Sequence, residues 1–200
     1  MASRGVFVVL EGGDGSGKST QQSLLVARLR SAGREVVATR EPGGTDVGAQ
    51  MRALLLGDDT IEPATEALVI AADRAEHVAR VIRPALERGA VVVSDRHVPS
   101  SLAYQGVGRG LGVDEIANLS KWATRGLAPD LIVVLDVPAE DATKRQDGPL
   151  DRMEREPAFR AMVNQAYRDL ADQFGWSVVD GTAPVEDVAE EIWELVRPLV

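Results

Sequence analysis

Residues 12–20 combine glycines, a lysine and two hydroxyl side chains at a spacing that suits phosphate binding. The pattern G-x-x-x-x-G-K-S is formed by Gly12, Gly13, Asp14, Gly15, Ser16, Gly17, Lys18 and Ser19, and Thr20 follows it. Such a loop directs successive backbone N–H groups at one point, where a helix dipole adds positive charge. We therefore expect it to bind a nucleoside triphosphate, with Lys18 reaching the β- and γ-phosphates and Ser19 coordinating Mg²⁺.

The sequence on either side of this loop supplies the elements that a phosphate site needs. Residues 6–10 form an apolar run typical of a buried strand, and residues 21–30 are predicted to form a helix. The alternative is a chance glycine-rich turn. A strand before the loop and a helix after it favour the phosphate-binding interpretation.

A second polar cluster, residues 94–97, follows the apolar run 90–93. Asp95 can hold the Mg²⁺ coordination shell, as the acid at the end of a second strand does in phosphate-loop enzymes. Asp136, after the run 131–135, is a competing candidate. We favour Asp95 because the guanidinium of the adjacent Arg96 suits a second phosphoryl group. His97 is assigned a scaffold role, because transfer between two phosphates needs little proton chemistry.

A glycine-rich stretch, residues 104–110, could contact a nucleoside. The amide of Gln105 can donate and accept hydrogen bonds, which matches the imide edge of a pyrimidine base. Tyr104 could form a flat wall against a sugar or ring. The alternative is an ordinary loop with a buried tyrosine.

Residues 144–155 have the composition of a small flap. A helical pattern gives way to Asp-Gly-Pro and then to an arginine-rich segment that includes Arg152 and Arg155, with Arg145 before it. Closure of such a flap would bring arginines to a transferring phosphoryl group and exclude water. A solvated charged hairpin is the alternative.

These segments must be positioned by a common framework, which the apolar pattern predicts. Short apolar runs recur at residues 6–10, 35–38, 90–93, 131–135 and 176–179, and helical patterns separate them. This alternation is typical of an α/β domain whose parallel sheet is buried on both faces. Ligands of such sheets bind beyond the carboxyl ends of the strands. No repeat or long linker divides the chain, so we expect a single domain over residues 1–200.

The long helical pattern over residues 63–88 has two distinct sides. One side carries a stripe that we assign to the core or to a partner helix, formed by Leu68, Ala71, Ala72, Ala75, Val78, Ala79, Ile82 and Leu86. Ile70, Arg74 and His77 lie roughly opposite. They form either a pocket wall or an ordinary exposed face.

Composition excludes several classes of function. The net charge of −9 over 200 residues argues against a protein that holds a nucleic-acid backbone. The absence of cysteine excludes disulfides, thiolate zinc sites and cysteine nucleophiles. The N-terminal apolar run is too short for a signal peptide or a membrane span, so we expect a cytoplasmic protein without a membrane partner.

The motifs together resemble those of bacterial thymidylate kinase, a phosphate-loop nucleoside monophosphate kinase. The resemblance rests on residues 11–20, 39–45, 95–97 and 103–110, in the order and spacing of the family. It implies a three-layer fold with a five-stranded parallel sheet flanked by helices and a short arginine-bearing lid at about residues 144–155. It also implies transfer of the ATP γ-phosphoryl group to dTMP to give dTDP, a Mg²⁺ cofactor, and a homodimer formed by packed helices.

The resemblance assigns roles to individual residues. ATP is expected at the phosphate loop, residues 12–20, and Mg²⁺ at Ser19 and Asp95. The dTMP-binding residues are expected to be Asp14 near the 3′-hydroxyl, Arg96 at the phosphate, Arg74 at thymine O4, and Arg40, Ile70, Tyr104 and Gln105. Catalytic roles are expected for Lys18, Arg96, Arg145 and Arg152. The phosphate loop lacks the arginine of one family branch, so the catalytic arginine is expected from the lid.

The sequence departs from the family pattern in two places. Ile70 replaces a phenylalanine that stacks on thymine, which removes aromatic stacking worth about 1 kcal/mol. The lid is shorter and less arginine-rich than in many relatives. The alternatives left open are a kinase of another nucleoside monophosphate or of a deoxynucleoside, a regulatory nucleotide binder, and a paralogue that no longer turns over. The Asn-Lys-x-Asp motif of GTP-dependent switches is absent from the sequence.

Overall fold

The computed structural model describes residues 4–57, 59–145 and 156–200. Five parallel strands form one sheet in the order β2-β3-β1-β4-β5. The strands are β1 (Phe7–Glu11), β2 (Val36–Arg40), β3 (Val91–Asp95), β4 (Leu131–Asp136) and β5 (Ser177–Asp180). The predicted parallel α/β sheet is therefore confirmed.

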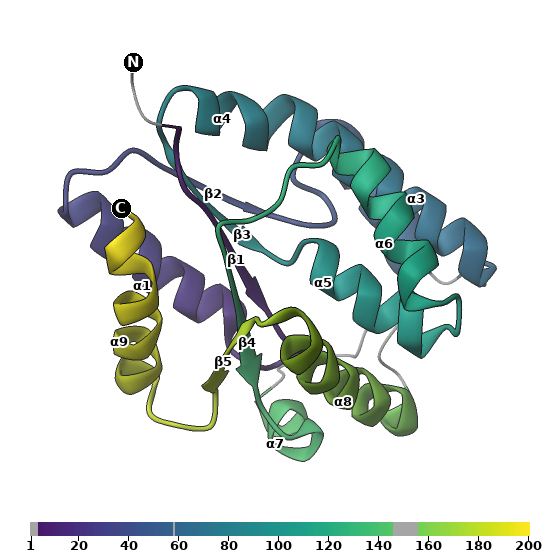
Figure 1. Ribbon diagram of the computed structural model, residues 1–200. Coiled ribbons are helices and arrows are strands. Elements are labelled where there is room, and N and C mark those ends of the chain that lie inside the picture. Colours follow the sequence, from purple (N-terminus) through teal and green to yellow (C-terminus); the bar gives the residue numbers. More distant parts are fainter. Residues whose placement is uncertain (1–3, 58, 146–155) are drawn as a thin grey trace.

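Helices cover both faces of the sheet, so that the molecule has three layers (Figure 1). The helices α1 (Lys18–Ser31) and α9 (Val185–Val196) pack together on one face. The other face carries most of the remaining helices, which are α3 (Pro63–His77), π-helical η1 (Val78–Ile82), α4 (Arg83–Glu87), α5 (Val98–Ser101), π-helical η2 (Leu102–Gly108), α6 (Val113–Thr124) and α8 (Pro157–Phe174). Shorter or peripheral elements are α2 (Asp46–Leu56), α7 (Ala139–Lys144) and the 3₁₀ helix η3 (Arg197–Leu199).

The strands alternate their side chains between two cores. In β1, Val8 and Leu10 pack with α1 and α9, whereas Phe7 and Val9 pack with η1 and α4. All four side chains are fully buried. A strand buried on both faces needs apolar residues at every position, which explains the continuous apolar runs in the sequence.

Each strand extends further toward its carboxyl end than the apolar pattern predicts. Glu11 pairs in register with Val134, and Arg40 pairs with Asp95. These polar residues are therefore part of the ladder and not of the loops after it. The backbone pairing fixes the position of these two residues at the carboxyl edge of the sheet, where a ligand is expected.

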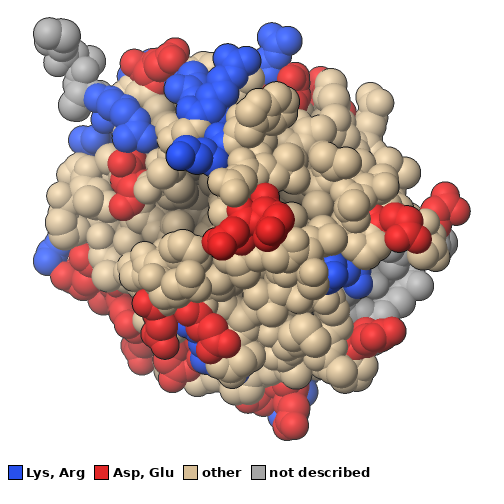
Figure 2. Space-filling view, turned by 45° about the vertical axis from the view of Figure 1, so that its right-hand side comes forward, with Lys and Arg blue, Asp and Glu red and all other residues tan. Residues whose placement is uncertain are grey.

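The predicted helix over residues 63–88 is divided by the π-helical segment η1. The wider π turn shifts the phase of the helix, so that Val78 and Ile82 are buried while Ala79 is exposed. Leu68 is 59% exposed and Ala72 is also exposed, so this part of the stripe is not core. Figure 2 brings the side of α3 and α6 forward and shows a broad area without charged side chains between charged rims.

No helix in the described parts of the chain combines the length and the apolar character that crossing a bilayer requires.

Candidate functional site

A cavity of about 1050 Å³ lies at the carboxyl ends of the strands. Its walls come from the phosphate loop, the turn after β2, α2, α3, the segment after β3, η2 and the loop before α9. The residues expected to bind ligands that line it are Asp14, Gly15, Ser16, Gly17, Lys18, Ser19, Thr20, Arg40, Ile70, Arg74, Asp95, Arg96, Tyr104, Gln105 and Arg145. Arg152 and most of the expected lid lie outside the described residues.

The phosphate loop has a backbone that requires glycine. Gly12 and Gly17 have φ angles of 135° and 94°, which L side chains rarely adopt. A Cβ on Gly12 would lie 2.6 Å from the carbonyl oxygen of Leu135. The Nζ atom of Lys18 donates to the carbonyl oxygens of Gly12 at 3.1 Å and Gly13 at 2.8 Å. Lys18 is thus held across the loop, with its ammonium group at the cavity wall.

Ser19 and Asp95 form the part of the cavity that suits a divalent cation. The Oγ atom of Ser19 donates to Oδ2 of Asp95 at 2.9 Å. Both oxygens are hard ligands of the kind that Mg²⁺ prefers. Asp136 instead pairs with Arg168 at 2.8 Å and does not line the cavity. The described residues contain no group of three or more acidic or histidine side chains that could hold a metal ion, so a cation here would need ligands from a bound nucleotide.

Arg96 connects the segment after β3 to the phosphate loop. Its φ angle of 72° lies in the left-handed region, which costs energy for a residue with a Cβ. The Nη1 atom donates to the Gly12 carbonyl oxygen at 2.9 Å, and Nη2 pairs with Asp14. Burial opposes ionisation of Asp14, but the charges of Arg96, Lys18 and Arg52 outweigh it and lower the pKa of Asp14.

Glu11 lies behind Arg96 and is fully buried. Its Oε1 accepts from the backbone N–H of His97 at 2.8 Å, and its Oε2 accepts from Ser100 Oγ at 2.6 Å and from the Tyr167 hydroxyl at 3.0 Å. Burial raises the pKa of Glu11, although the charge of Arg96 and these hydrogen bonds oppose the increase.

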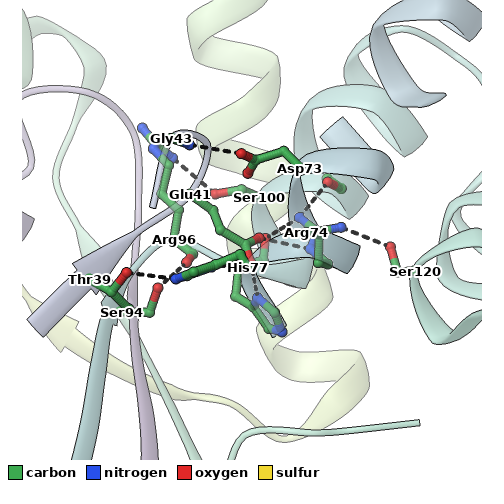
Figure 3. A network of polar contacts seen from close by, with 12 residues as sticks. Thr39, Glu41, Gly43, Asp73, Arg74, His77, Ser94, Arg96, Ser100 and Ser120 are labelled. Atoms are coloured by element: carbon green, nitrogen blue, oxygen red, sulfur yellow. Dashed lines mark hydrogen bonds and ion pairs between the residues drawn. The ribbon is translucent and has the colours of Figure 1, made fainter. Parts of the chain in front are cut away.

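Glu41, at the end of β2, organises a second buried network (Figure 3). Its Oε1 accepts from Nδ1 of His77 at 2.9 Å and Nδ1 of His97 at 2.8 Å, and its Oε2 accepts from Arg74 Nε at 2.8 Å. Burial would raise the pKa of Glu41, but these hydrogen bonds and charges hold it well below its usual value. Burial lowers the pKa of His97 more than Glu41 raises it, so we assign a neutral ring to His97 beside an ionised Glu41.

Arg74 is almost completely engaged by this network. It donates from Nε to Glu41, from Nη1 to Ser120 at 3.1 Å, and from Nη2 to the His97 carbonyl oxygen at 3.0 Å and Ser101 at 2.9 Å. A guanidinium has five N–H groups. These four hydrogen bonds therefore leave, among the described residues, one N–H on Nη1 for a ligand in the cavity.

Ile70, Tyr104 and Gln105 form the apolar end of the cavity, and each is at least nine-tenths buried. Tyr104 and Gln105 are neighbours on η2, and its π-helical geometry allows both side chains to reach the cavity wall. The Tyr104 ring centroid lies 5.3 Å from the guanidinium carbon of Arg96. Tyr104 thus links the apolar end of the cavity to the charged end.

The remaining expected residues lie at the rim. Arg145 donates from Nη1 to the Gly181 carbonyl oxygen at 2.8 Å, which places it beside the loop before α9. Arg40 is exposed at the end of β2. Both can move toward a ligand with little loss of packing.

The sequence analysis gave no role to Arg52 and Tyr167. Glu11, at the end of β1, and Glu41, directly after β2, lie in segments that the sequence analysis singled out, but their partners could not be predicted. Arg52 on α2 lines the cavity and donates to the Pro42 carbonyl oxygen at 3.1 Å. Tyr167 on α8 bonds Glu11 and Arg96. Neither helix carries a motif that indicates a site.

Comparisons with known proteins agree on one family. The family model of thymidylate kinase matches residues 10–192. The chain is 52% identical over 196 residues to the thymidylate kinase of Leifsonia xyli subsp. xyli, covering 94% of this chain and 92% of that protein. It is 45% identical over 201 residues to the thymidylate kinase of Halothermothrix orenii (97% of each) and 48% identical over 197 residues to that of a Synechococcus strain (96% and 95%).

Proposed function

Since the chain belongs to the thymidylate kinase family, whose members transfer the γ-phosphoryl group of ATP to dTMP, we propose that the cavity at the carboxyl edge of the sheet performs this reaction. The observation that carries the proposal is the contact between Arg96 and the phosphate loop, with Nη1 of Arg96 2.9 Å from the Gly12 carbonyl oxygen. Phosphates held by the loop and by Arg96 would therefore be neighbours. Adjacent donor and acceptor phosphates are what direct transfer requires.

The ATP side of the proposed site is the phosphate loop, residues 12–20. The backbone N–H groups at the start of α1 and the ammonium group of Lys18 would bind the triphosphate. Ser19 and Asp95 would hold Mg²⁺, which supplies positive charge to the phosphate oxygens. Lys18 would stay near the γ-phosphate as the negative charge moves toward the acceptor.

The acceptor side lies between Arg96 and α3. Arg96 would hold the phosphate of dTMP, with Arg40 and Arg52 available at the rim, and Asp14 would lie near the sugar. Tyr104 would pack against the deoxyribose. Because the acceptor phosphate is already charged, no general base is needed, and positioning and electrostatics supply most of the rate.

The base would occupy the end of the cavity formed by Ile70, Arg74 and Gln105. The remaining N–H of Arg74 suits thymine O4, a hydrogen-bond acceptor. Ile70 provides an aliphatic cover in place of an aromatic one. Arg145 and Arg152 remain proposed catalytic arginines of the lid, and the position of Arg145 near Gly181 supports a role on the ATP side.

A homodimer is proposed through the exposed side of α3. Leu68 is 59% exposed, and Trp122 on the neighbouring helix α6 is 79% exposed. A second copy would bury apolar side chains that water now contacts. Sedimentation of the wild type and of Leu68→Glu tests this proposal, with a shift toward monomer expected for the variant. A cytoplasmic protein without nucleic-acid or membrane partners also remains a proposal.

The direct test is ADP formation from ATP and Mg²⁺ with dTMP, dUMP, dCMP and UMP as acceptors. We expect the highest kcat/KM with dTMP. Lys18→Ala should lower kcat at least about 100-fold while the melting temperature changes by a few degrees at most. A different preferred acceptor would support another monophosphate kinase. Absence of ADP with every acceptor would support a paralogue that does not turn over.

A further inference from the structure

Glu66, in the first turn of α3, is a fully buried carboxylate that does not line the cavity. Its Oε1 accepts from Nε2 of Gln105 at 2.8 Å. It is also paired with Arg109, whose Nε and Nη2 each donate to it at 3.2 Å. Gln105 is itself 1% exposed and does line the cavity. A buried charge thus stands directly behind a side chain that faces the base end of the cavity.

The chemistry of this contact fixes the orientation of the Gln105 amide. The oxygens of an ionised carboxylate accept hydrogen bonds and cannot donate them. The NH₂ group of Gln105 must therefore face Glu66. Rotating the amide by 180° would bring its Oε1 against a carboxylate oxygen, two acceptors in a buried place, which costs the full desolvation of both groups.

Arg109 holds the carboxylate of Glu66 in position. Its guanidinium bonds both carboxylate oxygens, and its Cζ lies 4.6 Å from the centroid of the Phe159 ring. A planar guanidinium held by two hydrogen bonds and a ring face has few alternative positions. The carboxylate is consequently held in one place, and so is the amide that it fixes.

An amide held in one orientation distinguishes between pyrimidine bases, whereas an amide that can rotate does not. With NH₂ turned to Glu66, the Gln105 Oε1 is the acceptor available to a base. Thymine and uracil carry a donor at N3, whereas N3 of neutral cytosine is an acceptor. The remaining N–H of Arg74 likewise matches O4 and opposes the amino group of cytosine. Glutamine alone could satisfy either kind of base by rotating its amide.

We propose that Glu66 is a specificity-determining positioning residue, which holds the Gln105 amide in the orientation that accepts from the N3–H of thymine and so excludes cytosine nucleotides. Glu66 acts through Gln105 and contacts no substrate. This inference rests on the proposed placement of the base between Arg74 and Gln105.

The test is Glu66→Gln, which keeps the shape and replaces an acceptor oxygen by a donor NH₂. The new amide can donate to Gln105 Oε1, so both orientations of Gln105 become possible. We expect the ratio of kcat/KM for dTMP to that for dCMP to fall about tenfold, mainly through the KM values of the two acceptors, with the KM for ATP unchanged. Asp73→Asn, the same chemical change at another buried position of α3, should leave this ratio unchanged.

The outcomes separate this inference from the proposed function. If the wild type itself does not discriminate dTMP from dCMP, the placement of the base fails. If the wild type discriminates and Glu66→Gln keeps the full ratio, or if Asp73→Asn lowers it equally, the role of Glu66 is overturned.

A measurement on the wild type covers the case in which Glu66→Gln does not fold. The side-chain ¹⁵N–H₂ signals of Gln105, identified by their loss in Gln105→Met, should exchange with solvent far more slowly than those of surface glutamines, with and without dTMP. Exchange as fast as at the surface would show an amide that is free to rotate, and would overturn the proposal.

Discussion

Glu11 and Arg96 are joined through two shared hydroxyl partners, Ser100 and Tyr167. Arg96 Nη1 donates to both hydroxyl oxygens at 3.1 Å, and both hydroxyls lie within hydrogen-bonding distance of Glu11 Oε2. The buried carboxylate can therefore take the hydroxyl hydrogens, which leaves the oxygen lone pairs for the guanidinium. Glu11, which does not line the cavity, therefore sets the orientation of Arg96 through these two hydroxyl groups.

This relationship predicts that Glu11→Gln weakens binding of the acceptor. The NH₂ group of the amide would donate to the hydroxyls and turn their hydrogens toward Arg96, donor against donor. We expect the KM for dTMP to rise about tenfold, while the KM for ATP changes less than twofold, as measured by initial rates. Tyr167→Phe removes one of the two shared hydroxyls and should give a smaller change of the same kind. Equal increases for both substrates would contradict the relationship.

The hydrogen bond between Ser19 and Asp95 predicts where Mg²⁺ dependence originates. Ser19→Ala and Asp95→Asn should each lower kcat and raise the Mg²⁺ concentration for half-maximal rate by about tenfold, because the first removes a hard oxygen ligand and the second removes the negative charge of one. Asp136→Asn, the same change at the carboxyl end of strand β4, is the matched control. A Mg²⁺ titration in which Asp136→Asn behaves like Asp95→Asn would contradict the assignment.

We predict that a single substitution at Ile70 strengthens the binding of dTMP. Ile70→Phe restores an aromatic ring at the base end of the cavity, and stacking worth about 1 kcal/mol corresponds to a fall of about fivefold in the Kd for dTMP. Calorimetric titration with dTMP measures the change, and Ile70→Leu serves as the aliphatic control. Because Ile70 is 9% exposed, a lowered melting temperature would identify overpacking as the reason for any loss.

The buried network around Glu41 predicts that acid lowers stability in two stages. The lowered pKa of His97 means that the unfolded state binds a proton first, so stability is complete above the usual histidine value of about 6.5 and is lost as pH falls below it. The lowered pKa of Glu41 gives a second loss below about 4.5, its usual value.

Glu11 acts in the opposite sense. Its raised pKa makes its contribution complete below about 4.5 and lost as pH rises through the folded value. Melting temperatures between pH 7.5 and 4 test the balance. In His97→Asn, whose amide N–H can replace the Nδ1–H, the decline between pH 7 and 5 should be shallower than in the wild type. An unchanged decline would exclude His97 as its source.

The sequence predicted those parts of the site that depend on strand ends. Asp14, Arg40, Asp95 and Arg96 could be assigned to one place because the carboxyl ends of parallel strands meet at one edge. Glu66 could not be found in this way, because its role depends on the packing of α3 against η2.

The apolar pattern also could not predict the π-helical segments. A period of 100° per residue assumes α-helical turns, and η1 and η2 do not follow it. The pattern therefore assigned Leu68 and Ala72 to a core-or-partner stripe without distinguishing the two. The wider π turn likewise explains why Ala79 is exposed while Ile82 is buried.

The helix α3 borders both solvent and the nucleoside end of the cavity. Leu68 and Ala72 face outward two residues away from Ile70 and Arg74, and a helix is about 10 Å thick. Fluorescent labels, affinity tags or charge reversals placed on the outer side of this helix will therefore perturb nucleotide selection. Small molecules that bind to that outer side can inhibit the enzyme without competing with either substrate.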